Sequence, residues 1–421
     1  MSNVLSKALM GSTLVSSDDT AIMFYNISSV KERINCIRKI YPQNTLHAIA
    51  VKACPLTKIL SKIKESGVGA EVASLPELHL AEMAGFDPGN IVFDSPCKTR
   101  AEIEYALKAG VYLNADSFDE LDRIDEILKT VHSKSIVGVR INPQVGTGSI
   151  KATSVAGAIS KFGIPINNKE KITAYFLKYN WLRGIHVHIG SQGCPVPLVI
   201  EGIRKVLDLA VEINKNLKLD STLKHIETFD IGGGFPVSYY PGITPVVTME
   251  QYLEMLKVSC SELFNGQFRL ITEFGRYVYA NSGWVASKVE YVKRESGYTI
   301  IMTHVGADLF LRKSYNPDDW HHHITVVDQY GNLKTGADRN KYMVAGPLCF
   351  AGDVIARDLE LPVVTEGDYI LVHDTGAYTL SMWSRYNSRQ MPKVIGYSAQ
   401  SESFEILMER ESKEDLFEFW S

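Results

Sequence analysis

The sequence lacks the features that mark membrane proteins and secreted, disulfide-rich proteins. No segment approaches the length of a transmembrane helix, and the N-terminal stretch MSNVLSKALMGSTLVSSDD has no apolar run long enough for a signal peptide. The 6 cysteines show no paired spacing. We therefore expect a cytoplasmic protein with free thiols and no membrane partner.

The sequence also has no cluster of one charge sign. Its 44 Lys and Arg residues and 48 Asp and Glu residues give a net charge of −4, and the basic residues are scattered. Proteins that bind nucleic acid or anionic membranes usually carry basic patches. Nucleic acid is therefore not an expected partner, and small molecules are the expected ligands.

Low-complexity linkers and internal repeats are absent too, although 421 residues are enough for two domains. From about residue 45, short β-branched runs alternate with longer stretches of helical periodicity. The candidate strands are residues 45–51, 69–73, 90–93, 111–115, 136–142, 183–189, 225–231 and 269–273. This α/β pattern predicts a (β/α)8 TIM barrel, with a doubly wound open sheet as the structural alternative.

The pattern changes after about residue 280, where strand-like runs are joined by turn residues without helices between them. The stretch at 20–27 is also strand-like and precedes the first barrel unit. We expect it to pair with the later strands. The predicted organisation is an N-terminal segment (1–27), a barrel (28–280) and a C-terminal all-β domain (281–421) that includes the N-terminal strand.

Catalytic groups of a barrel collect where its strands end, so the residues at and directly after each predicted strand end are the candidates for the site. Each of these residues alone is more often structural than functional, but together they offer an amine, bare backbone amides, an imidazole and a carboxylate. Glycines without side chains expose the backbone N–H groups that a phosphate needs. The residues are Lys52, Glu71, His188, Ser191, Gly232, Gly233, Gly234, Glu273, Gly275 and Arg276.

This combination predicts a site for pyridoxal 5'-phosphate. The Lys52 amine would form a Schiff base with the cofactor aldehyde. The carboxylate of Glu273 would face the pyridine nitrogen and keep it protonated, so that the ring can accept electrons.

The sequence resembles the fold-type III pyridoxal phosphate decarboxylases, the group of ornithine, diaminopimelate and arginine decarboxylases with an alanine racemase-like barrel. The likeness covers nearly the whole chain and is greatest to diaminopimelate decarboxylases. It rests on ordered motifs: AVKAC, SKFGI, HVHIGSQ, DIGGGFPVSYY, TEFGRYV, GPLCFAGD, GAYTLSM and YNSR.

The resemblance implies a role for each matching residue. Lys52 is expected to carry the cofactor and His188 to stack on its ring. The phosphate is expected to contact Ser191, Gly232 to Gly234, the amides of Gly275 and Arg276, and Tyr378.

The resemblance also implies a homodimer with shared active sites, in which Cys349 and Tyr378 come from the partner subunit. After carbon dioxide leaves, an acid must return a proton to Cα. Cys349 resembles the residue that manages this step. Taken alone, its thiol would be interpreted as a small buried hydrophobe.

Two departures from the family concern the substrate. Relatives carry Glu or Asp directly after the cysteine, where it can pair with a distal ammonium, and this chain has Phe350. Arg312 and Tyr315 resemble residues that hold a substrate carboxylate, although the spacing differs by one residue and the usual Pro is missing. Three adjacent histidines, His321 to His323, lack a matching ligand cluster, so no metal site is expected.

We therefore predict a pyridoxal phosphate dependent carboxy-lyase, an amino-acid α-decarboxylase whose substrate differs from meso-diaminopimelate. One alternative is a diaminopimelate decarboxylase of lysine biosynthesis that recognises the distal end with other residues. An amino-acid racemase and a non-catalytic cofactor-binding relative are the remaining alternatives.

Overall fold

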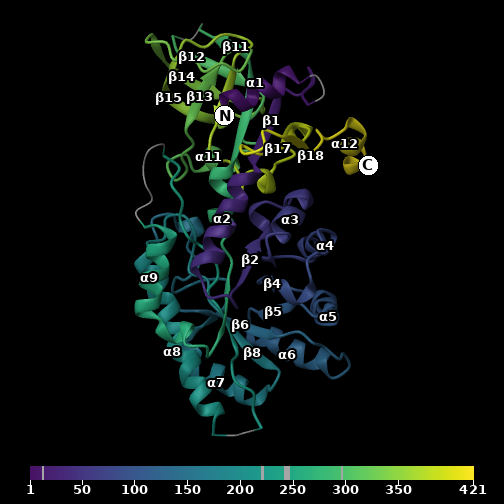
Figure 1. Ribbon diagram of the computed structural model, residues 1–421, viewed down its shortest axis with the longest axis vertical. Coiled ribbons are helices and arrows are strands. Elements are labelled where there is room, and N and C mark those ends of the chain that lie inside the picture. The colour runs from purple at the N-terminus through teal and green to yellow at the C-terminus, as the bar shows by residue number, and fades with distance from the viewer. Residues whose placement is uncertain (12–13, 220–221, 241–246, 295–296) are drawn as a thin grey trace. The chain divides into compact units, whose positions relative to one another are not determined.

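The computed structural model describes residues 1–11, 14–219, 222–240, 247–294 and 297–421 (Figure 1). The chain divides into two compact units. The barrel unit consists mainly of Lys31–Val237 and continues to Val278. The sheet unit combines Met1–Val30 with Tyr279–Ser421 and a short segment that begins at Ser238.

Eight parallel strands close into a barrel within the described residues of the barrel unit. The ring closes because β5 pairs with β6, so the predicted barrel is confirmed and the open-sheet alternative is wrong. A short extra strand, β7 (Ile164–Pro165), pairs with β6 outside the ring. The barrel strands are β2 (Leu46–Ala50), β3 (Gly69–Val72), β4 (Ile91–Asp94), β5 (Tyr112–Ala115), β6 (Val137–Asn142), β8 (Leu182–His186), β9 (Thr228–Asp230) and β10 (Arg269–Thr272).

These strands are apolar and β-branched because both of their faces are covered, as parallel sheets require. Every residue of β2, β3, β4 and β5 is buried. One layer of the barrel core is formed by Leu46, Ala48, Val92, Tyr112 and Ile271.

Helices follow most of the strands, and several begin at a side chain that caps the first turn. Ser74, Thr99, Ser117 and Thr248 each accept a hydrogen bond from a backbone N–H three residues later. Such caps fix where each connection ends and the helix begins. The helices are α2 (Ile27–Ile40), α3 (Thr57–Lys64), α4 (Leu75–Met83), α5 (Arg100–Ala109), α6 (Phe118–Leu128), α7 (Lys169–Lys178), α8 (Val196–Leu217), α9 (Met249–Ser259) and α10 (Gly275–Tyr279).

The sheet unit is a mixed β-sheet with the order β15-β14-β12-β11-β1-β17-β18, in which β16 pairs with both β11 and β13. It also contains the helices α1 (Ser2–Met10), α11 (Leu311–Tyr315) and α12 (Lys413–Trp420). Its strands are β1 (Ala21–Asn26), β11 (Gly283–Lys293), β12 (Thr299–Thr303), β13 (Ile324–Val327), β14 (Arg339–Ala345), β15 (Val354–Pro362), β16 (Tyr369–Val372), β17 (Lys393–Tyr397) and β18 (Phe404–Met408).

The N-terminal strand β1 lies inside this sheet, which confirms the predicted pairing. It runs antiparallel to β11 and parallel to β17. Phe24 of β1 stacks on Trp284 of β11 with ring centroids 4.2 Å apart. Leu5 and Ala8 of α1 pack into the same core, so α1 covers this part of the sheet.

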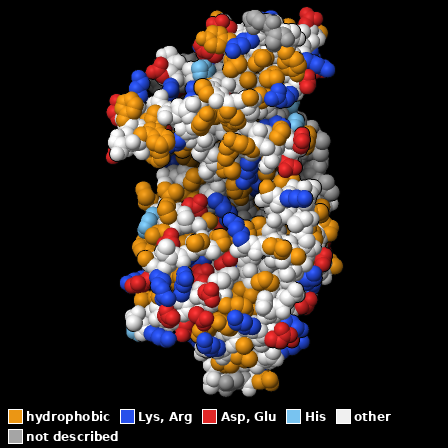
Figure 2. Space-filling view, turned by 180° about the vertical axis from the view of Figure 1, so that it is seen from behind, with side chains coloured by type: hydrophobic (Ala, Val, Ile, Leu, Met, Phe, Trp, Pro, Cys, Tyr) orange, Lys and Arg blue, Asp and Glu red, His pale blue; other side chains and the backbone are white. Residues whose placement is uncertain are grey.

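The surface carries both charge signs. Figure 2 shows Lys and Arg side chains interspersed with Asp and Glu over one face of the molecule. Among the described residues, no helix has the length and apolar character needed to cross a membrane.

Candidate active site

Lys52 lies directly after β2, in a short 3-10 turn over Val51–Ala53. Its Nζ donates a hydrogen bond to Oε1 of Glu71 on β3. The Lys52 side chain is 40% exposed, whereas the Glu71 side chain is completely buried. Burial raises the pKa of Glu71 to about 7, although the lysine charge acts in the opposite direction. The structure thus presents an accessible amine beside a buried carboxyl that can hold or release a proton near neutral pH.

His188 lies just after the end of β8 and contacts the glycine segment after β9. Its Nδ1 accepts a hydrogen bond of 3.0 Å from the Gly233 N–H, so the proton of the neutral ring is assigned to Nε2. Desolvation, together with the nearby Arg140 and Lys52 cations, lowers the pKa of His188 well below its ordinary value. The structure therefore offers a neutral, flat ring at the mouth of the barrel.

The triple glycine adopts a backbone that side chains would not fit. Gly232 and Gly234 have φ values of +67° and +95°. A Cβ at Gly234 would lie 1.9 Å from the Gly190 carbonyl oxygen, and one at Gly233 would lie 2.3 Å from the Glu273 carbonyl oxygen. Each of these positions therefore requires glycine. The glycine backbone packs directly against the backbone of Gly190 after β8 and of Glu273 after β10.

Ser191 and Arg276 meet beside this glycine segment. The Arg276 Nε donates a hydrogen bond of 3.0 Å to Ser191 Oγ, and Arg276 is only 4% exposed. The Gly275 N–H donates to the Glu273 carbonyl at 2.8 Å. Its predicted contact with a phosphate, like that of the Arg276 amide, stays a prediction.

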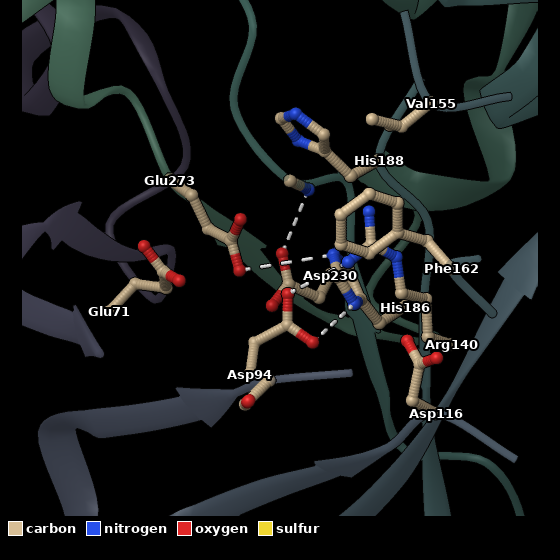
Figure 3. A network of polar contacts seen from close by, with 12 residues as sticks. Glu71, Asp94, Asp116, Arg140, Val155, Phe162, His186, His188, Asp230 and Glu273 are labelled. Carbon is tan, nitrogen blue, oxygen red and sulfur yellow. Dashed lines mark hydrogen bonds and ion pairs between the residues drawn. The ribbon is translucent and has the colours of Figure 1, made fainter. Parts of the chain in front are cut away.

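Figure 3 shows a buried polar cluster deeper in the barrel, which strand-end reasoning did not identify. His186 of β8 lies between two carboxyls: its Nδ1 is 3.4 Å from Asp94 Oδ1 and its Nε2 is 3.9 Å from Glu273 Oε1. Arg140 Nη1 is 3.5 Å from Asp94 Oδ2, and Asp230 accepts a hydrogen bond from the Gly232 N–H. Glu273 is therefore one of several buried charges.

The pKa values of two carboxyls in this cluster move in opposite directions. Burial, reinforced by the neighbouring Asp230 and Glu71 carboxyls, raises the pKa of Glu273 well above its ordinary range. Burial also acts to raise the pKa of Asp94, but the charges of His186 and Arg140 outweigh it and leave that pKa well below its ordinary value. Asp94 is the ionised member of the cluster.

The SKFGI motif supports Arg140. The Phe162 ring lies 4.5 Å from the Arg140 guanidinium carbon, an arrangement typical of a cation–π contact. Gly163 has a φ of +70°, and a Cβ there would come within 3.1 Å of the Arg140 side chain. This motif therefore holds the arginine that pairs with Asp94.

His186 and Arg140 lie inside the predicted strands 183–189 and 136–142, whereas we looked for site residues at and directly after strand ends. Asp94 directly follows the predicted strand 90–93 but was not selected. The sequence did contain a signal. His186 and His188 are two residues apart, and alternate residues of a strand point to the same face. If His188 faces the barrel mouth, His186 faces the barrel interior one layer below.

The GPLCFAGD motif forms a compact loop in the sheet unit. Its Asp353 carboxylate accepts hydrogen bonds of 2.6 Å each from the N–H groups of Ala307 and Leu348. Cys349 is exposed, and its N–H donates to Asn387 Oδ1 at 2.7 Å. The loop thus presents the thiol outward, in contrast to a buried structural cysteine.

Phe350 lies among aromatic side chains. Tyr315 of α11 stacks on it at 19° with ring centroids 6.0 Å apart, and Tyr386 meets it edge-on at the same distance. Tyr315 and Tyr386 are 66% and 48% exposed. The position directly after Cys349, where the resemblance led us to expect a carboxylate, is therefore occupied by an aromatic side chain among accessible tyrosines.

Arg312 and Tyr378 are neighbours in the sheet unit. The Arg312 guanidinium carbon lies 4.8 Å from the ring centres of both Trp320 and Tyr378. These contacts with two aromatic rings restrict the orientation of the Arg312 guanidinium. Tyr378 has a φ of +58°, an unusual backbone conformation for a tyrosine.

The three adjacent histidines contact Tyr240 and His373. His321 stacks on Tyr240, His322 bonds to the His373 carbonyl at 2.9 Å, and His323 meets the His373 ring edge-on. None of the three belongs to a group of metal-ligating side chains in the described part of the chain.

The predicted site residues therefore form two groups. The barrel unit brings together Lys52, His188, Ser191, Gly232, Gly233, Gly234, Glu273, Gly275 and Arg276. The sheet unit contains Arg312, Tyr315, Cys349, Phe350 and Tyr378.

Comparison with known families gives a direct match for both units. Residues 27–280 match the pyridoxal binding domain of pyridoxal-dependent decarboxylases, and residues 276–376 match the C-terminal sheet domain of the same enzymes. The first match alone covers more than half of the chain. The chain belongs to the pyridoxal-dependent decarboxylase family.

Individual relatives give a consistent result. The chain is 30% identical over 403 residues to a diaminopimelate decarboxylase of Aquifex aeolicus, covering 95% of this chain and 91% of that protein. It is 33% identical over 374 residues to one of Archaeoglobus fulgidus, covering 88% of this chain and 85% of that protein.

Solved structures agree on the fold. A Helicobacter pylori diaminopimelate decarboxylase complexed with L-lysine superposes with a TM-score of 0.83 at 28% identity, covering 96% of this chain and 97% of that one. A lysine/ornithine decarboxylase of Vibrio vulnificus, at 21% identity and a TM-score of 0.75, shares the fold and covers 92% of this chain and 97% of that one.

The protein is thus a carboxy-lyase with pyridoxal 5'-phosphate as its cofactor, as we predicted from the motifs. Its residues fit that cofactor. A cradle of three glycines excludes side chains, and Lys52 offers an accessible amine. Oε1 of the buried Glu273 has no hydrogen-bond partner among the described residues, so it can accept one from a ring nitrogen.

Proposed function

We propose that this enzyme decarboxylates an α-amino acid whose distal end carries no ammonium group, and therefore not meso-diaminopimelate. Phe350, in contact with Tyr315 and Tyr386 beside Cys349, is the observation that carries the proposal. A distal ammonium placed against these rings would lose hydration without gaining a carboxylate partner. Leaving a charge unpaired costs several kcal/mol, which changes substrate preference by orders of magnitude.

In this proposal the barrel unit binds the cofactor. Lys52 would attach it, and the neutral ring of His188 would lie against the ring of the cofactor. Ser191, Arg276 and the backbone of Gly232 to Gly234 would hold its phosphate together with Gly275 and Tyr378. Glu273 would face the ring nitrogen. When bound, the cofactor accepts the electrons that the departing carboxylate leaves at Cα.

The protein side chains then manage protons. The substrate amine would take the place of Lys52, and the Glu71 carboxyl, which accepts a hydrogen bond from Lys52 Nζ, would pair with the freed lysine. The bond between Cα and the carboxylate breaks, carbon dioxide leaves, and Cys349 manages the return of a proton to Cα.

Arg312 supports one further property of the substrate. Its guanidinium is already oriented by Trp320 and Tyr378, so it can bind an anion with little loss of side-chain entropy. Together with Tyr315, it favours a carboxylate or another anionic group on the substrate. The best candidates are acid-terminated amino acids and conjugates that mask the distal amine.

We also propose that the enzyme is a cytoplasmic homodimer that shares its active sites. The site residues belong to two units of the chain, and in the family the Cys349 and Tyr378 positions come from the partner subunit. Mixing two variants with strongly reduced decarboxylation, Lys52→Ala and Cys349→Ala, tests this arrangement. Mixed dimers that share sites recover activity, whereas self-contained subunits do not.

An ordinary diaminopimelate decarboxylase is the second candidate, because the relatives above at 30% and 33% identity carry that name. The deciding experiment measures carbon dioxide release from meso-diaminopimelate, acid-terminated amino acids and conjugates in which the distal amine is acylated. A kcat/KM of about 10⁴ M⁻¹s⁻¹ or more for meso-diaminopimelate, as for good enzymes, would refute the first candidate. Turnover of an amine-masked substrate alone would support it.

A further inference from the structure

His186 is a buried titratable residue with no role in the function proposed above. It is completely buried on β8, and neither ring nitrogen has a hydrogen-bond partner among the described residues. Figure 3 shows the ring between the carboxyls of Asp94 and Glu273. Buried polar groups are normally satisfied, so this arrangement requires an explanation.

A second histidine of the barrel shows what a structural role looks like. His47 of β2 is also buried, and its Nδ1 forms a hydrogen bond of 2.8 Å with Thr272 Oγ1. Burial lowers the pKa of His47 to about 4, which keeps it neutral. His47 and His186 therefore differ in their surroundings and not in their burial.

The surroundings of His186 are acidic. Its charged and titratable neighbours come from the strands packed around β8 and from the segment after β10. They are Asp94 on β4, Arg140 on β6, His188 after β8, Asp230 on β9 and Glu273 after β10. Three carboxyls thus face the ring, and Arg140 is the permanent cation among these neighbours.

The position of one proton decides the charge of Glu273. Asp94 is ionised, so the Nδ1 side of His186 faces an acceptor. On the other side, either His186 Nε2 carries a proton and Glu273 is a carboxylate, or Glu273 is protonated and the imidazole is neutral. Only the ionised form of Glu273 can accept a hydrogen bond on both of its oxygens. Only that form carries the negative charge that keeps a pyridine nitrogen protonated.

We propose that His186 is a positioning residue: held between Asp94 and Glu273 as an imidazolium, it keeps Glu273 ionised for the ring nitrogen of the cofactor. The inference rests on the proposed function, in which Glu273 faces that nitrogen. His186 itself touches neither cofactor nor substrate in this scheme. It acts through the carboxylate next to it.

The test compares holoenzyme variants His186→Gln and His47→Gln. We expect His186→Gln to shift the pH midpoint of the cofactor absorbance band by about one unit or more. We expect kcat to fall about 10- to 100-fold, a range typical of residues that orient an active group, with little change in KM. His47→Gln should leave the band and kcat unchanged, because that side chain does not contact Glu273.

A double-variant cycle shows whether His186 acts through Glu273. If it does, the pair His186→Gln and Glu273→Gln has no larger effect than Glu273→Gln alone. Additive losses would overturn the inference. A Glu273→Gln band identical to wild type would instead refute the proposed role of Glu273, so the two failures can be told apart.

Two further measurements cover the remaining outcomes. If His186→Gln does not fold, Asp94→Asn should shift the band in the same direction, since it removes the counterion of the imidazolium, and an unchanged band in this variant overturns the inference. Stoichiometric metal in the purified holoenzyme, lost from Asp94→Asn, would also overturn it, because these side chains would then be ligands.

Discussion

The two units differ in how their predicted site residues compare with the pattern that the family resemblance implies. In the barrel unit, the expected lysine, histidine, glycine and glutamate residues are all present. In the sheet unit the expected cysteine is present, but Phe350 follows it where an acidic residue was expected. Under the proposed function, the barrel unit binds the cofactor, and the sheet unit supplies the proton-transferring Cys349 and determines the choice of substrate.

Among the variants that test the two units, Lys52→Ala in the barrel unit should cause the largest loss of activity. Without the amine the cofactor has no covalent attachment, so we expect turnover of every substrate to fall to background. The cofactor absorbance should be lost on dialysis, whereas Lys58→Ala, in a helix of the same unit, should retain it. If Lys52→Ala kept both the cofactor absorbance band and the activity, attachment of the cofactor through Lys52 of the barrel unit would be refuted.

Cys349→Ala should have the next largest effect. Loss of a group that transfers a proton to carbon typically slows turnover by about 10²- to 10⁴-fold. Cofactor binding should be unchanged, because the barrel unit binds it, and transamination should replace part of the decarboxylation. Cys97→Ala removes an exposed thiol of the barrel unit and is the matched control. Equal kinetics for both variants would contradict the role of Cys349.

Phe350→Glu tests the substrate half of the comparison. We expect kcat/KM for meso-diaminopimelate to rise about 10- to 100-fold, because a charged hydrogen bond replaces an unpaired ammonium. Phe350→Gln has nearly the same shape as Phe350→Glu without the charge and should give a much smaller gain. If neither variant changes the ratio between substrates, residue 350 does not face the distal group.

The smallest expected effect concerns stability and pH in the barrel unit. Folding raises the pKa of Glu71 from 4.5 to about 7, so the folded state binds more protons than the unfolded state between these values. The contribution of Glu71 therefore destabilises the protein increasingly as pH rises from 4.5 to about 7.

Glu71→Gln removes this titration. The free energy of unfolding of the cofactor-free variant, relative to wild type, should increase by about 1 to 3 kcal/mol between about pH 5 and pH 8. Urea denaturation at several pH values measures this difference. Glu65→Gln, an exposed side chain at the C-terminal end of α3, should run parallel to wild type. A parallel curve for Glu71→Gln would show that Glu71 does not titrate in this range.

The barrel could be predicted from sequence because short, largely buried strands alternate regularly with segments of helical periodicity. The sheet unit was harder to predict. We did not predict β15 or β18, whose residues are partly exposed and include charged side chains that interrupt the apolar pattern. The short helix α11 was also missed, because its five residues provide too little periodicity.

The residues of the candidate site, too, could be predicted only in part from the sequence. Residues directly after strands, such as Lys52 and His188, could be found from sequence and lie where we expected. His186 was missed because it lies inside a predicted strand, and Asp94 was missed although it directly follows one, because the two become neighbours only when the barrel closes. Their importance depends on distances between strands that are far apart in sequence.

The place of β1 inside the sheet has a consequence for biosynthesis. Ile22 pairs with Lys393, so one of the first strands to leave the ribosome lies beside one of the last. The sheet unit cannot complete its core until nearly the whole chain has been made, whereas the barrel strands all precede β11 and can pair earlier. During synthesis the apolar residues of β1 must therefore remain exposed, or be shielded by a chaperone, until their partners β11 and β17 have been made.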